Sequence, residues 1–312
     1  RQLAWQGRQL QVNGRPWLQA LDAPAQVQAA AFDHADPLAT TSAVIDWAAW
    51  SARRLSVPLE LLHVLERPPE LPHVGDYSGA LGLGAQEVLL QQLSALDEQR
   101  GKLAQEAGRQ ILQNARDRAS AAGVQQVDGR MRHGELVDTL LELEPDARLF
   151  VLGEHYHASS PRRIHLDHHV ERVIRAVKRP VLVATADQFV APERFVIAYD
   201  GSATARKTVD MVAASPLLQG LPALVAMVGA DTPTAQNALQ DARHILQGAG
   251  FAVETTLLPG EPEQALPDLL PSQGAALLVM GAYGHSRIRH LMVGSTTTTL
   301  LRLSTAPVLI LR

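Results

Sequence analysis

The chain has 312 residues, more than one ordinary domain, and 46% of them are hydrophobic, so two domains with buried cores are expected. Its net charge of −4 excludes a basic footprint for nucleic acid or an anionic membrane, and its lack of cysteine excludes disulfides, thiolate metal sites and cysteine nucleophiles. No apolar stretch reaches the ~18 residues of a membrane span and no signal peptide opens the sequence, so a cytoplasmic protein is expected.

In chain order, the first 25 residues fit neither of the two repeats that follow and are expected to form an N-terminal extension. Beyond them, short apolar runs alternate with longer helical stretches, which favours βαβ units around a parallel sheet. The predicted strands lie near 27–32, 58–64, 124–132, 148–153 and 180–184, and then near 194–199, 222–228, 251–258, 275–280 and 306–311. Five strands are therefore expected in each half.

The two halves carry the same signals in the same order. An apolar strand ends on aspartate at Asp33 and again at Asp200, and a buried run ends on glycine at Gly153 and again at Gly281. The segment that joins the halves is short and ends in proline, so the halves should pack together. The sequence therefore predicts an extension at 1–25 followed by tandem domains at 26–187 and 193–312.

A long helix is predicted near 85–122 in the first half, where the second half has only 233–249. Apolar residues recur along one stripe of this helix, which favours a helix that covers the sheet. A helix that binds a partner is the alternative. The stripe consists of Leu89, Leu93, Leu96, Leu103, Ala107 and Ile111.

The sharpest local motif spans 281–296 and has the form G-x2-G-x9-G-[ST]. Gly281 and Gly284 stand where a strand opens into a loop, and glycine lets backbone N–H groups approach an anion closely. Gly294, Ser295 and Thr296 then start a helix, whose unpaired N–H groups and dipole favour phosphate. The alternative is a turn that merely connects strand to helix. Neither a Walker A loop nor a dinucleotide-binding fingerprint is present.

These residues, together with Asp200 followed by Gly201 and Ser202, the turn at 260–262 and the closing strand at 307–310, resemble the universal stress protein family in its ATP-binding class. The resemblance implies an α/β fold of two tandem doubly wound domains. Each would hold a five-stranded parallel sheet of order 3-2-1-4-5 with helices on both faces. It also implies that the two closing strands meet across a pseudo-two-fold axis.

By the same resemblance, the ligand is ATP, with or without Mg²⁺, at the carboxyl edge of the second sheet. Asp200 would meet the adenine or ribose side, although taken alone an aspartate at this position is more often a helix cap. The backbone around Val228 would line the adenine. The phosphates would be held by Gly281, Gly284, Gly294, Ser295 and Thr296.

The first domain departs from the motif. Asp167, His168 and His169 stand where the second domain has Gly294, Ser295 and Thr296, and an acidic residue there repels a triphosphate. A degenerate first site is therefore predicted, although Asp33 and Val64 keep its adenine-side positions. The histidine-rich loop at 155–169 is interpreted as solvated surface, with a zinc or nickel site as the alternative.

No catalytic residue is predicted, because no base that could position water can be identified. The primary hypothesis is a universal stress protein that binds ATP through its second domain. It would act as a nucleotide-dependent stress-response regulator, with at most slow hydrolysis or self-phosphorylation. One alternative is a protein-interaction module of the same fold with both sites lapsed. Another is an enzyme of this broad fold, such as an adenosine-nucleotide hydrolase or an electron-transfer flavoprotein-like domain. A homodimer of tandem chains is left open.

Overall fold

The computed structural model describes residues 3–6, 9–12, 15–16, 26–31, 39–65, 83–153, 168–186, 188–282 and 295–312. Strands and helices alternate in both repeats. The first repeat contains β4 (Gln26–Ala31), α1 (Ala39–Leu55), β5 (Leu59–Leu65), α2 (Leu83–Ala121), β6 (Val127–His133), α3 (Leu136–Leu143), β7 (Ala147–Gly153), α4 (His168–Ala176) and β8 (Val181–Ala184). The second contains β9 (Arg194–Ala198), α5 (Ala203–Ala214), β10 (Ala223–Val228), α6 (Pro233–Gly248), β11 (Val253–Leu258), α7 (Pro262–Leu269), β12 (Ala276–Gly281), α8 (Ser295–Leu303) and β13 (Val308–Leu311). Short 3-10 turns follow α5 and α7 at Pro216–Leu218 and Leu270–Gln273.

The strands of both repeats belong to one ten-stranded sheet, in the order β11-β10-β9-β12-β13-β8-β7-β4-β5-β6. The predicted α/β class with two repeats is confirmed. The five-stranded sheet expected in each repeat is merged with that of the other repeat, and the two closing strands meet, as the resemblance implies. The strands of each repeat follow the order 3-2-1-4-5 within the merged sheet.

The merger occurs at the closing strands β8 and β13, which pair antiparallel with Leu182 opposite Leu309. Every residue of both strands is apolar and buried. A strand that is apolar on both faces is poorly suited to a sheet edge, because it would expose its ladder and its side chains together. Pairing the two closing strands with each other removes both edges at once.

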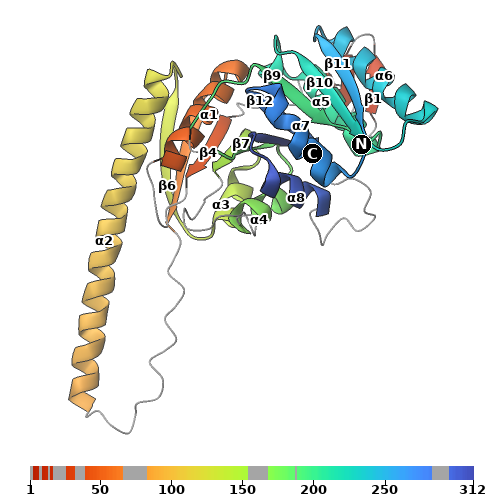
Figure 1. Cartoon of the computed structure of the whole chain (residues 1–312). Helices are drawn as coiled ribbons and strands as arrows, with labels where there is room; N and C mark the ends of the chain where they lie inside the picture. Colours follow the sequence, from red (N-terminus) through yellow and green to blue (C-terminus); the bar gives the residue numbers. More distant parts are fainter. Residues whose placement is uncertain are drawn as a thin grey trace.

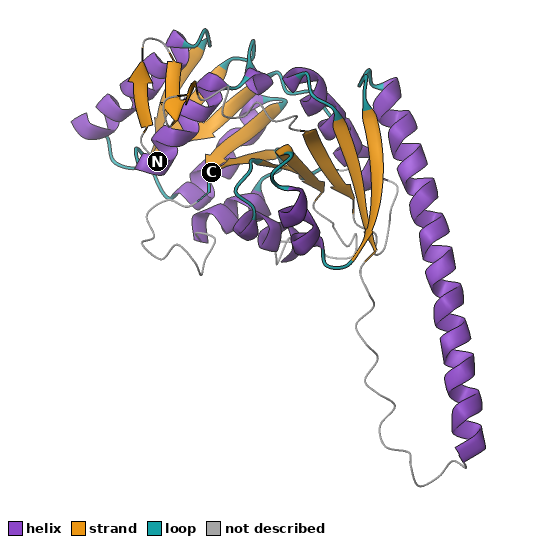
Figure 2. Ribbon diagram, turned by 180° about the vertical axis from the view of Figure 1, so that it is seen from behind, coloured by secondary structure: helices purple, strands orange, loops and turns teal. Residues whose placement is uncertain are grey.

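Helices cover both faces of this sheet (Figure 2). One hydrophobic cluster packs α1, α2, α5 and α6 on the first face, and another packs α3, α4, α7 and α8 on the second. In β9, for example, Phe195 and Ile197 belong to the first cluster and Val196 to the second. This alternation is the period-two pattern of a strand that is buried on both sides.

The repeats also contact each other outside the sheet. The Arg54 side chain on α1 donates hydrogen bonds to the carbonyls of Leu217, at 2.9 Å, and Gln219 in the second repeat. The Phe189 ring in the joining segment packs edge-on against Trp47 of α1, with 4.8 Å between ring centroids. The halves therefore pack together, as the short linker predicts.

The apolar stripe of helix α2 does not cover the sheet along its whole length, although the sequence predicts that it does. Its C-terminal half packs on the first repeat, where Ala115 and Ala119 are buried. Its N-terminal half extends away from the body of the molecule (Figure 1), and Leu96 and Leu103 are 49% and 64% exposed. The expected sheet-covering role is therefore wrong for this half, because the helix continues past the edge of the sheet that it would cover.

The N-terminal extension forms a small antiparallel sheet of its own, made of β1 (Leu3–Gln6), β2 (Gln9–Val12) and β3 (Arg15–Pro16). Leu3 lies opposite Val12 and Gln6 opposite Gln9, a hairpin register that the sequence analysis did not predict. Across the described ranges, no helix has both the length and the apolar character that crossing a bilayer requires.

Candidate functional site

Three neighbouring parallel strands of the second repeat end at the same edge of the sheet. β9 pairs with β10 on one side, where Ala198 is opposite Ala226, and with β12 on the other, where Ile197 is opposite Val279. Asp200 follows the end of β9, Val228 ends β10 and Gly281 ends β12. The structure thus brings these three predicted site residues to one edge.

This edge lies where the strand order reverses. The connection after β9 leads through α5 on the first face to β10, whereas the connection after β12 leads through α8 on the second face to β13. Chain leaving β9 and β12 therefore diverges to opposite faces. In open α/β sheets, such a divergence leaves a crevice in which ligands bind.

Asp200 begins a tight turn into α5. Gly201 has a φ of +73°, in the left-handed region that favours glycine. The carboxylate oxygen Oδ1 of Asp200 accepts a hydrogen bond from the Ser202 backbone N–H at 2.9 Å. Ser202 is the N-cap of the helix, and its Oγ accepts from the backbone N–H of Ala205 at 3.1 Å. Asp200 is therefore a turn-forming residue rather than the cap, and it is exposed at the sheet edge.

Tyr199, just before this turn, lies at the edge of the site and is not part of the predicted motif. It is buried, and burial raises the pKa of its phenol, while a hydrogen bond with Arg206 opposes that shift. Asp200 and Asp241 lie close enough to raise the pKa further. The phenol therefore stays protonated at neutral pH beside the Arg206 cation. An aromatic residue next to the strand-ending aspartate is the signal that could have found it.

Gly281 is held against α5. A Cβ atom at this position would lie 2.9 Å from Thr204 Cγ2 and 2.9 Å from Thr208 Oγ1, closer than real Cβ contacts. Thr208 is buried, and its hydroxyl donates to the carbonyl of Thr204 at 3.1 Å. Close helix–strand packing therefore suffices to explain glycine at the end of β12. The two threonines, four residues apart on α5, were not predicted.

The remaining predicted phosphate residues fall around the start of α8. Ser295 and Thr296 are its first two residues. The helix begins at the same edge at which β12 ends, since it must run back before the parallel strand β13. Its first backbone N–H groups have no partner within the helix and are available to an anion. Gly284 and Gly294 lie outside the described residues.

The corresponding edge of the first repeat is described only in part. Val64, the counterpart of Val228, is buried at the end of β5. Asp33 and Asp167 lie outside the described residues, as does most of the histidine-rich loop, so the degenerate first site stays a prediction. His169 is half-buried on α4. Within the described ranges, no group of three or more histidine, aspartate or glutamate residues is arranged to hold a metal ion.

The fold and this edge define a tandem, doubly wound α/β protein. The family model of the universal stress protein family matches residues 35–185 and 192–312, and the chain belongs to that family. It is 36% identical over 269 residues to the universal stress protein Slr1230 of Synechocystis sp., covering 85% of this chain and 93% of that protein.

Solved structures share the fold. A universal stress protein from Archaeoglobus fulgidus superposes with a TM-score of 0.65 at 17% identity, covering 91% of this chain and 98% of that one. A structure from Pseudomonas aeruginosa superposes with a TM-score of 0.57 at 15% identity, covering 94% of each chain.

Proposed function

We propose that this universal stress protein binds ATP at the carboxyl edge of its second repeat and acts as a nucleotide-dependent regulator of a stress response. The observation that carries the proposal is the convergence of Asp200, Val228 and Gly281 at the point where the strand order reverses. In this proposal the repeats at 26–187 and 193–312 have different roles. Only the second retains a nucleotide site, and the first is structural or regulatory.

The described residues fit an adenine nucleotide. The exposed Asp200 carboxylate is a suitable acceptor for ribose hydroxyls, since one of its oxygens is already fixed by the Ser202 N–H. Val228 is a half-buried apolar residue of the kind that lies against a base. The first turn of α8, with Ser295 and Thr296, supplies N–H groups for phosphate, and Gly284 and Gly294 are assigned to the loop before it.

Bound ATP would supply a polyanionic chain and a transferable terminal phosphate, with Mg²⁺ as an optional counter-ion. The chain's own residues in this proposal bind and orient the nucleotide, and none is assigned as a base. Turnover is therefore expected to be slow, with the occupied and empty forms as the regulatory states.

Calorimetric titration of ATP into the full chain tests the proposal. Gly294→Asp combined with Ser295→His installs the residues of the first repeat, and we expect it to weaken binding by at least about tenfold, because a carboxylate then faces the phosphates. The reciprocal change, Asp167→Gly combined with His168→Ser in the first repeat, leaves the second repeat intact and should leave the affinity of the second-repeat site unchanged. Equal binding by all three proteins, or none by any, would refute the assignment.

The protein-interaction module is the second candidate. The observation that favours it is the exposed leucine stripe on the N-terminal half of α2. Under this alternative, ATP would bind neither repeat, so the same titration separates the two candidates.

A further inference from the structure

Residues 91–107 of α2, called here the outer half of α2, form a rod that stands clear of the sheet. Residues 91–104 are all exposed, and Leu93, Leu96 and Leu103 are 37%, 49% and 64% exposed. At 1.5 Å per residue, the rod is about 25 Å long. Isolated helices of this length are marginal in water, and most helical stability in proteins comes from packing an apolar face.

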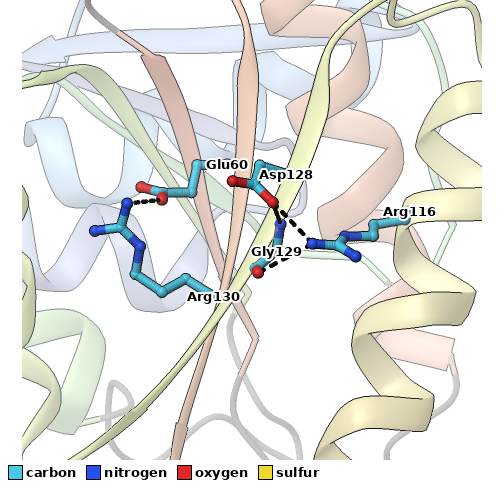
Figure 3. Close-up of polar contacts among 5 residues, drawn as sticks. All are labelled: Glu60, Arg116, Asp128, Gly129 and Arg130. Carbon is cyan, nitrogen blue, oxygen red and sulfur yellow. Dashed lines mark hydrogen bonds and ion pairs between the residues drawn. The ribbon is translucent and has the colours of Figure 1, made fainter.

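The inner half of α2 is fixed to the first repeat, which sets the direction of the rod. Figure 3 shows the Arg116 side chain reaching from α2 to β6, where its Nη2 donates to Asp128 Oδ1 at 2.8 Å and to the Gly129 carbonyl at 3.1 Å. Arg118 makes a bidentate pair with Asp46 of α1, with N–O distances of 2.7 and 2.6 Å. These contacts anchor the helix and leave its outer half projecting.

The apolar residues of the outer half have coiled-coil spacing. Leu93, Leu96, Leu103 and Ala107 occupy successive a, d, d and a positions of a heptad, and Arg100 fills the a position between Leu96 and Leu103. A seam of this kind needs a second helix, since each a or d side chain packs between residues of a facing helix. The sequence pattern therefore predicts a helical partner of about the same length.

The single charge in the seam, Arg100, determines the direction in which two copies can pair. In an antiparallel pair of identical helices, a positions face d positions. Leu93 then lies opposite Leu103 of the second copy, and Arg100 lies opposite Leu96 of the second copy. The aliphatic stem of Arg100 can cover that leucine while its guanidinium stays at the rim of the seam, where it pairs with Asp97 of its own chain at 3.9 Å. A parallel pair would instead place the two Arg100 cations side by side in the seam, which is repulsive.

The shape of the molecule agrees with the antiparallel arrangement. The folded body is attached at the C-terminal end of α2 (Figure 1), so antiparallel rods place the two bodies at opposite ends. Parallel rods would bring both bodies to the same end. The closing strands β8 and β13 already have neighbours on both sides within one chain, so they offer no edge to a second copy.

We propose that the outer half of α2 is a self-association surface through which two copies of this chain pair as an antiparallel coiled coil. The nucleotide edge of the second repeat takes no part in this contact, so the inference is independent of the proposed function.

Sedimentation analysis of the full chain tests the pairing. The wild-type chain should show a concentration-dependent monomer–dimer equilibrium. Leu103→Glu, which places a carboxylate against Leu93 of the second copy, should raise the dimer dissociation constant at least about tenfold. Ser94→Glu adds the same charge at a neighbouring position outside the seam and should leave that constant near the wild-type value.

Cysteine cross-linking tests the direction, since the natural chain has no cysteine. Under oxidation, the double variant Leu93→Cys with Leu103→Cys should form covalent dimers, and Leu93→Cys alone should not. A parallel pair would reverse the second result, because it places position 93 of one copy beside position 93 of the other.

Three results would overturn the proposal. The first is a wild-type chain that stays monomeric across the measured concentrations. The second is efficient cross-linking of Leu93→Cys alone. The third is a Leu103→Glu variant whose dimer dissociation constant stays at the wild-type value, which would mean that the leucine stripe is not the contact between the two copies.

Discussion

Two glycines on α2 provide a matched test of which part of this helix packs on the sheet of the first repeat. Gly108 faces the sheet, and a Cβ atom there would lie 2.8 Å from His63 Cδ2 and 2.9 Å from Met131 Cε. Gly101 lies two turns earlier, on the outer half. A Cβ atom there would have no heavy atom within 4 Å apart from the backbone of its own helix. Each glycine is replaced by alanine in a separate variant.

Both substitutions gain the same helix propensity, about 1 kcal/mol, so this contribution cancels in the comparison. The Met131 methyl is the end of a flexible side chain and can move. The His63 ring is buried on β5 and cannot move without displacing its neighbours. Overpacking of this kind costs about 1–3 kcal/mol. We therefore expect Gly101→Ala to be the more stable variant by about 1–3 kcal/mol.

Urea unfolding followed by far-ultraviolet circular dichroism measures this difference through the transition midpoints, provided that the slopes agree. Gly101→Ala should unfold at a higher midpoint than the wild-type chain. Equal midpoints for the two variants would mean that α2 does not pack on β5 and β6 at residue 108.

Three further predictions concern stability. Burial raises the pKa of the Asp210 carboxyl above its ordinary value of 3.8, so its ionisation costs stability as pH rises through the raised pKa. Asp210→Asn should therefore raise the Tm at pH 7, with a gain that shrinks as the pH is lowered toward 4. Gly281→Ala should cost about 1–3 kcal/mol of unfolding free energy in urea, and combining it with Thr208→Ala should cost less than the sum of the single changes. Arg118→Ala should cost roughly 0.5–1 kcal/mol in low salt, because it breaks the half-exposed bidentate pair with Asp46, and the loss should diminish in 1 M NaCl, where the Debye length is about 3 Å.

Each of these predictions has a clear counter-result. An Asp210→Asn gain that is unchanged between pH 4 and pH 7 would place its origin outside the ionisation of Asp210. Strict additivity in the pair of changes at Gly281 and Thr208 would show that the two residues are not in contact. An Arg118→Ala loss that is insensitive to salt would mean that packing of the side chain dominates over its charge.

Much of the fold could be predicted because the repeat appears directly in the sequence. Strands that end just before Asp200 and on Gly281 alternate with helices of sufficient length, and the apolar runs at 181–184 and 308–311 indicate closing strands buried on both faces. Parallel pairing within each repeat then follows, because each strand there is separated from the next by a helix. The family resemblance implied the order of the strands, which alternation alone does not determine.

Other features could not be predicted, because local periodicity does not identify a partner. The stripe containing Leu96 and Leu103 has the same spacing whether it faces a sheet or a second helix, and only the point at which α2 leaves the body distinguishes the two. Gly281 was predicted from its place in a phosphate motif, whereas its contact with α5 depends on Thr204 and Thr208, more than seventy positions away. Such contacts follow from the tertiary packing and not from the motif.

The number of ATP molecules bound per chain shows whether the second repeat alone holds a nucleotide. Calorimetry on the full chain should give one nucleotide per chain, and Gly294→Asp combined with Ser295→His should remove it. Two nucleotides per wild-type chain, or one that persists in this variant, would rule out a single site in the second repeat, because either result would place ATP in the first repeat.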